Sequence, residues 1–473
     1  NSRANTGFPP RDSRRDKTRP NPFLKLTDLN PGGGIGANSL LVEVGPFRFV
    51  IDSGLHPKLA GNKAMPMFSL VERKSLDFIV LTHCHLDHLG SLPVLSRENP
   101  DTPILATQAT RAIARRMLSN SVAVMKRQRG ELNLPEYPLY NREDVSILKD
   151  RFQLLDIEKP FVFEKNGDTL EVTLHHAGHV VGAASCSVSR NGQRIFFTGD
   201  VLFNDQRILK GAKPPLDPVD ILVMETTRGL TARAPEKQRE AEIVRVLEDI
   251  RKTIKRGGSV LIPVFALGRM QEMLVILEEA RRRGAIPHAP VFCSGLGMDL
   301  VNYFHEISKQ SHQVNFSRKV LKSLGVRPIA RRIEPGREPS HPGIYLVSSG
   351  MLVENTPSYA LASGLLGSDR NTIIFVGYCD PDTPGGKLLT KQNGQDFTFE
   401  AIDYITPIRA RIRQYDMSGH ADREELLALA KKLEPKTIFL HHGDPKARDW
   451  FRESLADSPS HIIDPEPLKQ YEA

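Results

Sequence analysis

The chain has 473 residues, of which 40% are hydrophobic and 25% are charged, and its formal net charge is +8. This length exceeds what one hydrophobic core usually supports, so two or three compact units are expected in a soluble globular protein. No run of about 18 uninterrupted apolar residues is present, which argues against a membrane-spanning helix, and no membrane partner is expected.

The basic charge is concentrated at the start of the chain. Residues 1–25 hold seven Arg or Lys against two Asp, together with four Pro and few apolar residues. This composition predicts a basic disordered tail. Such a tail could help to hold an anionic polymer, or it could serve only as a solubilising arm.

The cysteines suggest neither a metal site nor a disulfide framework. All four are scattered and form no C-x-x-C pair: Cys84, Cys186, Cys293 and Cys379. No signal peptide is visible. A reducing compartment, the cytoplasm, is therefore the expected location.

The first regular elements are predicted between Leu40 and Asp52. Two β-rich runs flank a Gly45-Pro46 turn there, which is typical of a hairpin. Asp52 ends the second run. A carboxylate in that position could orient a metal-bound histidine, or it could be an ordinary turn residue.

The next strand, residues 76–82, runs directly into His83, His85, Asp87 and His88. Side chains two residues apart share one face of an extended backbone, so the first three are expected to converge. Imidazole nitrogen and carboxylate oxygen both suit Zn²⁺. Four such side chains within six residues cannot easily reach one ion, so the spacing favours two adjacent metals, an arrangement suited to phosphoester hydrolysis.

Later strands end in residues of the same kinds. A short strand at 103–107 and a helix at 108–130 are followed by a strand at 169–175 that leads to His179. The runs 194–200 and 219–225 end in Asp200 and Glu225, and Asp200 could bridge two ions. Recurrent strands of this kind predict a sheet whose carboxyl edge carries the site.

From residue 230 to 388, long helices alternate with short strands, which predicts an independent α/β unit. A helix is expected at 236–256, and another is expected to open at Phe265. Site residues return after this unit. His420 precedes an amphipathic helix with Asp422 as its predicted N-cap, and a strand at 437–442 ends in His442.

These motifs, in this order, resemble the metallo-β-lactamase fold nucleases of the β-CASP family. The H-x-H-x-D-H signature matches residues 83–88, and the third and fourth ligand motifs match His179 and Asp200. The family's motifs A, B and C match Glu225, His420 and His442. The resemblance runs from about residue 40 to 455.

The resemblance implies an α/β fold, namely an αββα metallo-β-lactamase sandwich with an inserted α/β β-CASP domain. The expected organisation is a tail at 1–25, the first part of the metallo-β-lactamase domain at 26–229, the β-CASP cassette at 230–388 and the return segment at 389–473.

The family also implies roles for individual residues. One metal ion would be held by His83, His85 and His179, the other by Asp87, His88 and His442, with Asp200 shared between them. The expected ions are two Zn²⁺, with Mn²⁺ as the alternative. The implied catalytic residues are His420, Glu225 and Asp87. Arg269 is expected to contact a phosphate. Arg228 stands where the family more often has an aromatic residue that faces the substrate.

The implied function is a zinc-dependent ribonuclease, with endonuclease action favoured. RNA is the expected partner, single-stranded DNA is a second candidate, and a homodimer is allowed. The alternatives are a DNA nuclease of the Artemis type, a non-catalytic subunit of an RNA-processing complex, and a small-molecule hydrolase. Family DNA nucleases tend to lack histidine at motif C, and the inserted cassette leaves the last alternative unsupported.

Overall fold

The structure is a computed structural model that describes residues 23–234, 238–329 and 333–473. The predicted basic tail therefore lies almost entirely outside the described residues. Its boundary at residue 25 is wrong, because Leu24 and Lys25 already belong to the first β-strand.

The first and last parts of the described chain form a sandwich of two seven-stranded sheets. The first sheet contains, in spatial order, β22 (Gln470–Glu472), β1 (Leu24–Asp28), β2 (Leu40–Val44), β3 (Phe47–Ile51), β4 (Phe78–Val80), β5 (Ile104–Ala106) and β6 (Phe152–Leu154). The second contains β21 (His461–Ile463), β20 (Thr437–His441), β11 (Ile221–Glu225), β10 (Gln193–Phe197), β9 (Ala184–Arg190), β8 (Asp168–His176) and β7 (Phe161–Lys165). The hairpin predicted around Gly45-Pro46 is confirmed as β2 and β3.

Apolar side chains from both sheets fill the space between them. Phe49 in β3 stacks on Phe78 in β4 with ring centroids 4.5 Å apart, and Phe78 stacks on Phe163 in β7 of the other sheet at 4.4 Å. Neighbouring strand residues that point the other way pack against helices. Each sheet is therefore covered on its outer face as well, which is the arrangement that parallel strands require.

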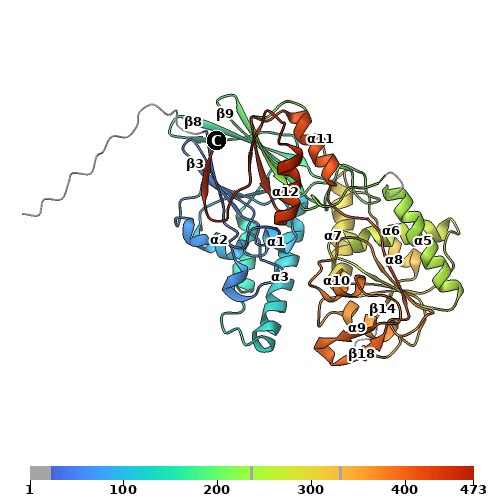
Figure 1. The fold of residues 1–473 in the computed structure, drawn as a ribbon. Coiled ribbons are helices and arrows are strands. Elements are labelled where there is room, and N and C mark those ends of the chain that lie inside the picture. Colours follow the sequence, from blue (N-terminus) through green and yellow to red (C-terminus); the bar gives the residue numbers. More distant parts are fainter. Residues whose placement is uncertain (1–22, 235–237, 330–332) are drawn as a thin grey trace, which may run out of the picture.

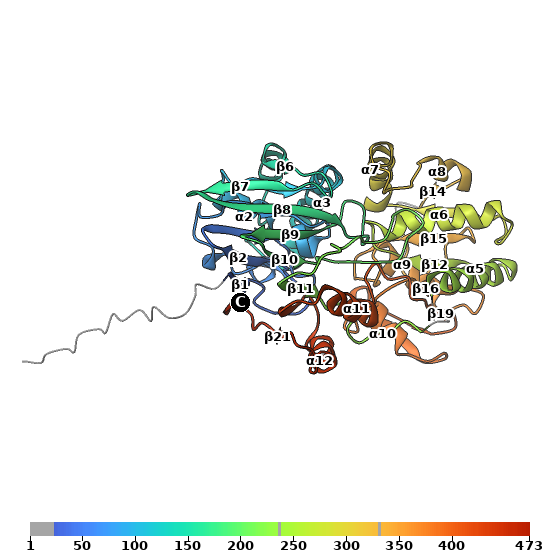
Figure 2. The ribbon, with the colours of Figure 1, turned by 90° about the horizontal axis from the view of Figure 1, so that it is seen from above.

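Helices lie on both outer faces of the sandwich (Figures 1 and 2). The first sheet carries α1 (Leu86–Leu89), α2 (Leu92–Glu98), α3 (Gln108–Glu131) and α4 (Arg142–Ile147), and the second carries α11 (Arg423–Leu433) and α12 (Pro445–Ser454). The predicted N-cap of α11 is confirmed, because the Asp422 carboxylate accepts hydrogen bonds from the backbone N–H groups of Glu424 and Glu425. The αββα sandwich is confirmed as well.

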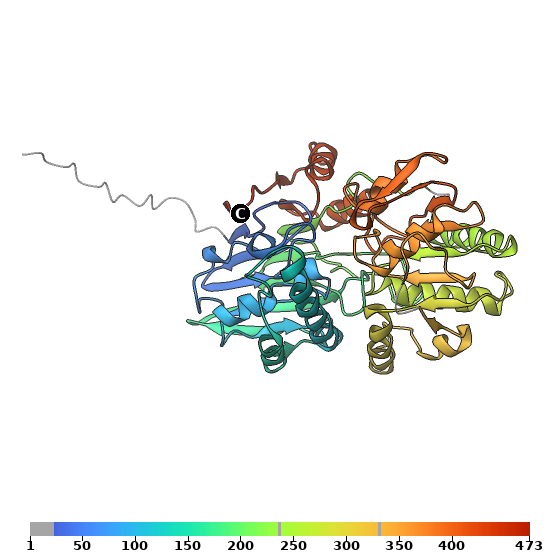
Figure 3. The same cartoon turned by 90° about the horizontal axis from the view of Figure 1, so that it is seen from below.

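The inserted cassette is a second α/β lobe beside the sandwich (Figure 3). Its parallel sheet contains, in spatial order, β14 (Arg327–Pro328), β13 (Val291–Cys293), β15 (Ile344–Val347), β12 (Val260–Pro263), β16 (Thr372–Phe375) and β19 (Arg411–Gln414). Its helices are α5 (Arg239–Lys255), α6 (Arg269–Arg282), α7 (Leu296–Gln310), α8 (Lys319–Leu324), α9 (Pro357–Leu365) and α10 (Pro384–Leu389), and β17 (Asp396–Phe399) pairs with β18 (Tyr404–Pro407).

The cassette sheet includes one strand from the predicted return segment, because β19, which lies beyond residue 388, pairs in parallel with β16. The helix expected to open at Phe265 begins at Arg269, because Gly268 has a φ of 92°, far outside the helical region. Residues 264–268 therefore form a loop at the carboxyl edge of the cassette sheet.

Among the described residues, no helix is both long enough and apolar enough to cross a membrane.

The backbone after β3 is tied to the backbone of α1. The N–H of Ser53 donates to the His88 carbonyl at 2.7 Å, and the N–H of Leu55 donates to the Leu86 carbonyl at 2.8 Å. Gly54 lies between them, and a Cβ atom placed on it would be 1.7 Å from the Asp87 carbonyl oxygen. Only glycine allows this approach.

We therefore expect Gly54→Ala to lower the free energy of unfolding by about 3 kcal/mol or more, because the methyl group would push α1 away from β3. Chemical denaturation measures this change. Gly130→Ala is the matched control, since a Cβ atom at Gly130 in α3 would meet nothing within 4 Å. It should change stability by less than about 1 kcal/mol. Equal stability of the two variants would contradict the proposed constraint.

Candidate metal and catalytic site

In the histidine-rich segment after β4, the backbone passes from extended to helical at His85. His85 keeps the extended backbone expected after the strand, with a φ of −66° and a ψ of 148°. The expectation that Asp87 continues this alternation is wrong, because α1 begins at Leu86. The N–H groups of His88 and Leu89 donate to the His85 carbonyl at 3.0 and 2.9 Å and turn the chain into a helix. The helical turn directs Asp87 and His88 toward a neighbouring position.

Three imidazoles meet at the first position. The Nδ1 atom of His85 lies 3.2 Å from His83 Nε2 and 3.0 Å from His179 Nε2. The Nδ1–H of His179 donates to the Gly419 carbonyl at 2.7 Å, which leaves its Nε2 lone pair directed at the other two rings. Burial lowers the pKa of His83 and of His179 well below the ordinary value. The rings are therefore neutral and can offer lone pairs to a cation.

Asp87, His88 and His442 meet at the second position. The Oδ2 atom of Asp87 lies 3.4 Å from His442 Nε2 and 3.7 Å from His88 Nε2. Both of these imidazole nitrogens are buried and have no hydrogen-bond partner among the described residues. An unpartnered buried nitrogen is costly unless something outside the protein chain occupies the space beside it.

Asp200 lies between the two positions. Its Oδ2 atom is 3.3 Å from His88 Nε2 and 3.6 Å from both His83 Nε2 and His179 Nε2. Its Oδ1 atom is 3.1 Å from His442 Nδ1. One carboxylate thus contacts both groups of predicted ligands, as a bridging residue would.

This donor set fits a divalent metal. The ligand-type atoms fall into overlapping groups whose atoms all lie within 4.8 Å of one another, among them His83–His85–His179 and Asp87–His88–His442. Burial opposes the charged form of His442, but the Asp200 and Asp87 carboxylates together outweigh burial and raise the pKa of His442 to about 10. The carboxylates therefore favour positive charge here, which protons or metal ions can supply.

Asp52 supports His88 from behind. Its Oδ2 atom lies 2.7 Å from His88 Nδ1 and accepts the Thr82 hydroxyl at 2.7 Å, while its Oδ1 atom accepts the Thr82 N–H at 2.8 Å. Fixing the Nδ1–H of His88 in this way directs Nε2 toward the cluster. The structure thus places Asp52 where the sequence analysis expected a supporting partner.

Two further residues in this region, Asn38 and His441, were not identified from the sequence. The Asn38 side-chain nitrogen lies 2.9 Å from His88 Nδ1, and its oxygen accepts a hydrogen bond from His441 Nε2 at 2.5 Å. Asn38 precedes β2 in a glycine-rich stretch and carries no motif. Only the meeting of β20 with the loop before β2 reveals its position.

His420 lies outside the two predicted triads, although it also forms a group with His179 and Asp200 whose ligand-type atoms lie within 4.8 Å of one another. Its Nδ1 lies 3.0 Å from Glu225 Oε2, and its Nε2 lies 4.0 Å from Asp200 Oδ2. Glu225 is itself fixed, because it accepts the Val201 N–H at 2.7 Å. Burial acts against the charged form of His420, but Glu225 and Asp200 raise its pKa above the ordinary value. The ring is held so that Nε2 can carry a proton facing the cluster.

Two arginines lie in unexpected surroundings. Arg269 forms an ion pair with the buried Glu272, and only 10% of its side chain is exposed, so its phosphate contact stays a prediction. Arg228, which stands where the family more often has an aromatic residue that faces the substrate, has a side chain that is only 8% exposed and pairs with Asp416 at 2.6 Å.

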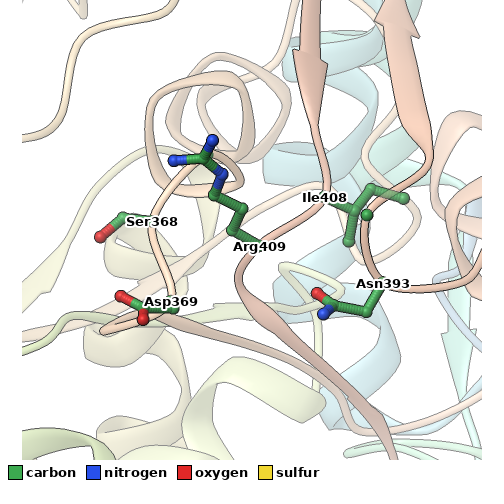
Figure 4. A pocket seen from close by; sticks show the side chains of 7 residues that line it. Ser368, Asp369, Asn393, Ile408 and Arg409 are labelled. Carbon is green, nitrogen blue, oxygen red and sulfur yellow. The ribbon is translucent and has the colours of Figure 1, made fainter.

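A hollow of about 420 Å³ lies elsewhere, in the cassette (Figure 4). It opens before β16 and β19, at the amino edge of the cassette sheet. The loops that approach the histidine cluster lie at the carboxyl edge, where the Leu267 carbonyl is 3.5 Å from His85 Nε2. The hollow is thus not part of the cluster. Its lining residues are Gly367, Ser368, Asp369, Asn393, Gly394, Ile408 and Arg409.

Comparison with family profiles identified three matches along the chain. The metallo-beta-lactamase superfamily matches residues 32–242, the Beta-Casp domain matches residues 270–388, and the Zn-dependent metallo-hydrolase RNA specificity domain matches residues 405–463.

Several curated proteins are similar over most of this chain. Transcription termination factor FttA of Methanocaldococcus jannaschii is 30% identical over 457 residues, which cover 90% of this chain and 68% of that protein. Integrator complex subunit 11 of Danio rerio is 27% identical, covering 92% of this chain and 71% of that protein. Endoribonuclease YSH1 of Candida glabrata is 28% identical, covering 93% of this chain but only 57% of that protein.

Among solved structures, a protein of unknown function from Enterococcus faecalis V583 superposes with a TM-score of 0.53 at 15% identity, covering 95% of this chain and 100% of that one. At this identity the likeness supports the fold alone.

Removal of metal should destabilise the protein, because the lone pairs of His83, His85 and His179 would then face one another without a cation. Dialysis against a chelator is expected to lower the Tm, and Zn²⁺ at about 100 times its Kd should restore about 2.7 kcal/mol of stability. Calorimetry with and without metal measures this. An unchanged Tm would show that the cluster holds no ion.

Asp52→Ala should weaken metal binding about 10- to 100-fold, because His88 would lose the partner that orients it. Metal titration by calorimetry tests this. Asp220→Ala is the matched control, since Asp220 also accepts a backbone hydrogen bond, from Arg194 at 2.9 Å, but contacts none of the predicted ligands. Wild-type metal affinity in Asp52→Ala would refute the supporting role.

Proposed function

This chain belongs to the metallo-β-lactamase superfamily and, within it, to the proteins with an inserted β-CASP domain, and on that premise we propose that it is a metal-dependent endoribonuclease that hydrolyses RNA phosphodiester bonds. The observation that carries the proposal is the position of His420. A metal cluster alone is shared by many hydrolases, but here a further imidazole, paired with Glu225, faces the cluster from the return segment.

The residues that would hold metal are the two triads and the shared Asp200. We infer two Zn²⁺ ions, with Mn²⁺ as the alternative, because the ligands combine imidazole nitrogen with carboxylate oxygen. When bound, such ions would supply Lewis acidity that offsets phosphate charge and makes water a better nucleophile at neutral pH. Asp87 is expected to bind the metal ion at the second position together with His88 and His442.

His420 and Glu225 supply the remaining chemistry. Glu225 accepts the Nδ1–H of His420 and holds the ring in one orientation. Glu225 and Asp200 also favour the charged ring, in which Nε2 carries a second proton that can be donated. We propose that this proton goes to the oxygen that leaves when the phosphodiester bond breaks. A general acid in this position typically accounts for about 10² to 10⁴ of the rate.

RNA is favoured as the substrate for two reasons. One of the similar proteins is named an endoribonuclease, and the profile matched at residues 405–463 is described as an RNA specificity domain. Single-stranded DNA as a second substrate and a homodimer are further proposals, which matched DNA oligonucleotides and sedimentation would test. The four unpaired, buried cysteines support a cytoplasmic location.

We expect His420→Ala to lower cleavage of RNA about 10²- to 10⁴-fold while metal content stays at the wild-type level, because the ring donates a proton but holds no ion. RNA labelled at the 5′ or the 3′ end is incubated with each protein, and the products are resolved by length. Internal fragments from both labels, lost in the variant, would support the proposal.

Mononucleotides released first from one end would make the enzyme an exonuclease instead. His305→Ala is a suitable control, because His305 lies in α7 of the cassette and belongs to none of the groups of possible metal ligands. This variant should cleave RNA like the wild type. Loss of metal together with activity in His420→Ala would make His420 a ligand rather than an acid.

A further inference from the structure

The segment that carries His420 has no regular secondary structure. Residues 415–420 run from the end of β19 toward α11 without helix or strand. Its internal hydrogen bonds are local, with the Ser418 N–H donating to Asp416 at 3.3 Å and the His420 N–H donating to the Ser418 hydroxyl at 3.1 Å. Other segments also hold it, because the Gly419 carbonyl accepts from His179 at 2.7 Å and the Glu242 carboxylate accepts the Asp416 N–H at 2.6 Å. The position of the imidazole therefore depends on contacts from outside the segment.

Arg228 joins the two ends of this segment. Its Nη2 donates to the Asp416 carboxylate at 2.6 Å, and its Nη1 donates to the His420 carbonyl at 3.2 Å. Burial favours the neutral form of Asp416, but Arg228 and Arg233 lower its pKa, so the carboxylate stays charged. The rigid fork of a guanidinium suits such a bridge, because one planar group fixes two acceptors at a set separation.

Arg239 holds the middle of the segment from the cassette side. This first residue of α5 donates from Nη1 to the Ser418 carbonyl at 3.2 Å, while its Nη2 pairs with Glu272 of α6. Its side chain is 6% exposed and that of Glu272 is fully buried. The segment is therefore attached to the linker before the cassette through Arg228 and to the cassette helices through Arg239.

We propose that Arg228 and Arg239 are positioning residues that hold the His420 imidazole at the distance from the metal cluster at which it can protonate the leaving oxygen. This inference rests on the proposed function. Neither arginine faces the cluster, so each acts through the backbone carbonyls of the segment. A shift of about 1 Å in a catalytic group can cost about 10²-fold in rate.

Arg228 is the better residue to change. Removing Arg239 would leave Glu272 with Arg269 in a fully buried site, which risks unfolding. Removing Arg228 leaves Asp416 paired with Arg233 at 3.2 Å. Arg228→Met keeps the apolar stem and should fold. If Arg228→Met does not fold, the test is made with Arg228→Lys, which retains one charged donor.

The expected result is a loss of about 10- to 100-fold in kcat on RNA for Arg228→Met, with metal content and KM within about 3-fold of the wild type. Arg281→Met is the matched control, because Arg281 also donates to two backbone carbonyls, those of Leu324 and Ala289, at the far end of α6. It should leave kcat unchanged.

A change of leaving group separates positioning from a purely structural role. An activated ester such as bis(4-nitrophenyl) phosphate releases an anion that needs no proton, so a misplaced acid should matter little. Arg228→Met should lose less than about 3-fold on this ester, and the same should hold for His420→Ala. When both changes are combined, the loss on RNA should stay within about 3-fold of that of His420→Ala alone.

Equal losses on RNA and on the activated ester, or multiplicative losses in the double variant, would overturn the inference. Failure of the proposed function would look different, because the wild-type protein would then cleave the activated ester but not RNA. In that case the same comparison is made with single-stranded DNA of matched sequence, and the same order of losses supports the inference.

Discussion

The arrangement of the sandwich depends on one electrostatic constraint, the burial of imidazole lone pairs and carboxylates within a few ångströms of one another. Asp200 lies within 4.0 Å of five histidines, and two of these have a buried Nε2 without a hydrogen-bond partner. Such a cluster is unfavourable unless cations occupy it. The surrounding strands must therefore hold these groups in place at a cost, and the large apolar core between the sheets provides that stability.

The inserted cassette contributes to the site without supplying any of the predicted ligands. Its loop after β12 brings the Leu267 carbonyl to His85, and its first helix brings Arg239 to the segment of His420. The cassette sheet continues to β19, directly before that segment. The cassette therefore contacts both sides of the site, His85 through Leu267 and the segment of His420 through Arg239. The metal side is anchored in the sandwich by backbone hydrogen bonds and by Asp52.

Much of the site could be predicted from the sequence, because a hydrophobic run that ends in a polar residue can be recognised without knowledge of distant contacts. The hairpin before Asp52, the strands before Asp200 and Glu225, and the strand before His442 all lie where hydrophobic runs predicted them. The surroundings that the sequence did not reveal depend on distant contacts. Arg228 is buried because Asp416, 188 residues later, lies beside it. Asn38 was invisible because its partners, His88 and His441, come from two other segments.

The sequence by itself determined the residue types of the site, the order of the motifs and the α/β class, since ligand chemistry and the alternation of apolar residues depend on neighbours along the chain. The tertiary structure alone decided which of these residues meet. It placed His420 beside Asp200, although 220 positions separate them, and it joined β19 to the cassette. The physical reason is that strand pairing and the packing of buried side chains bring together groups whose separation along the chain carries no information about their distance in space.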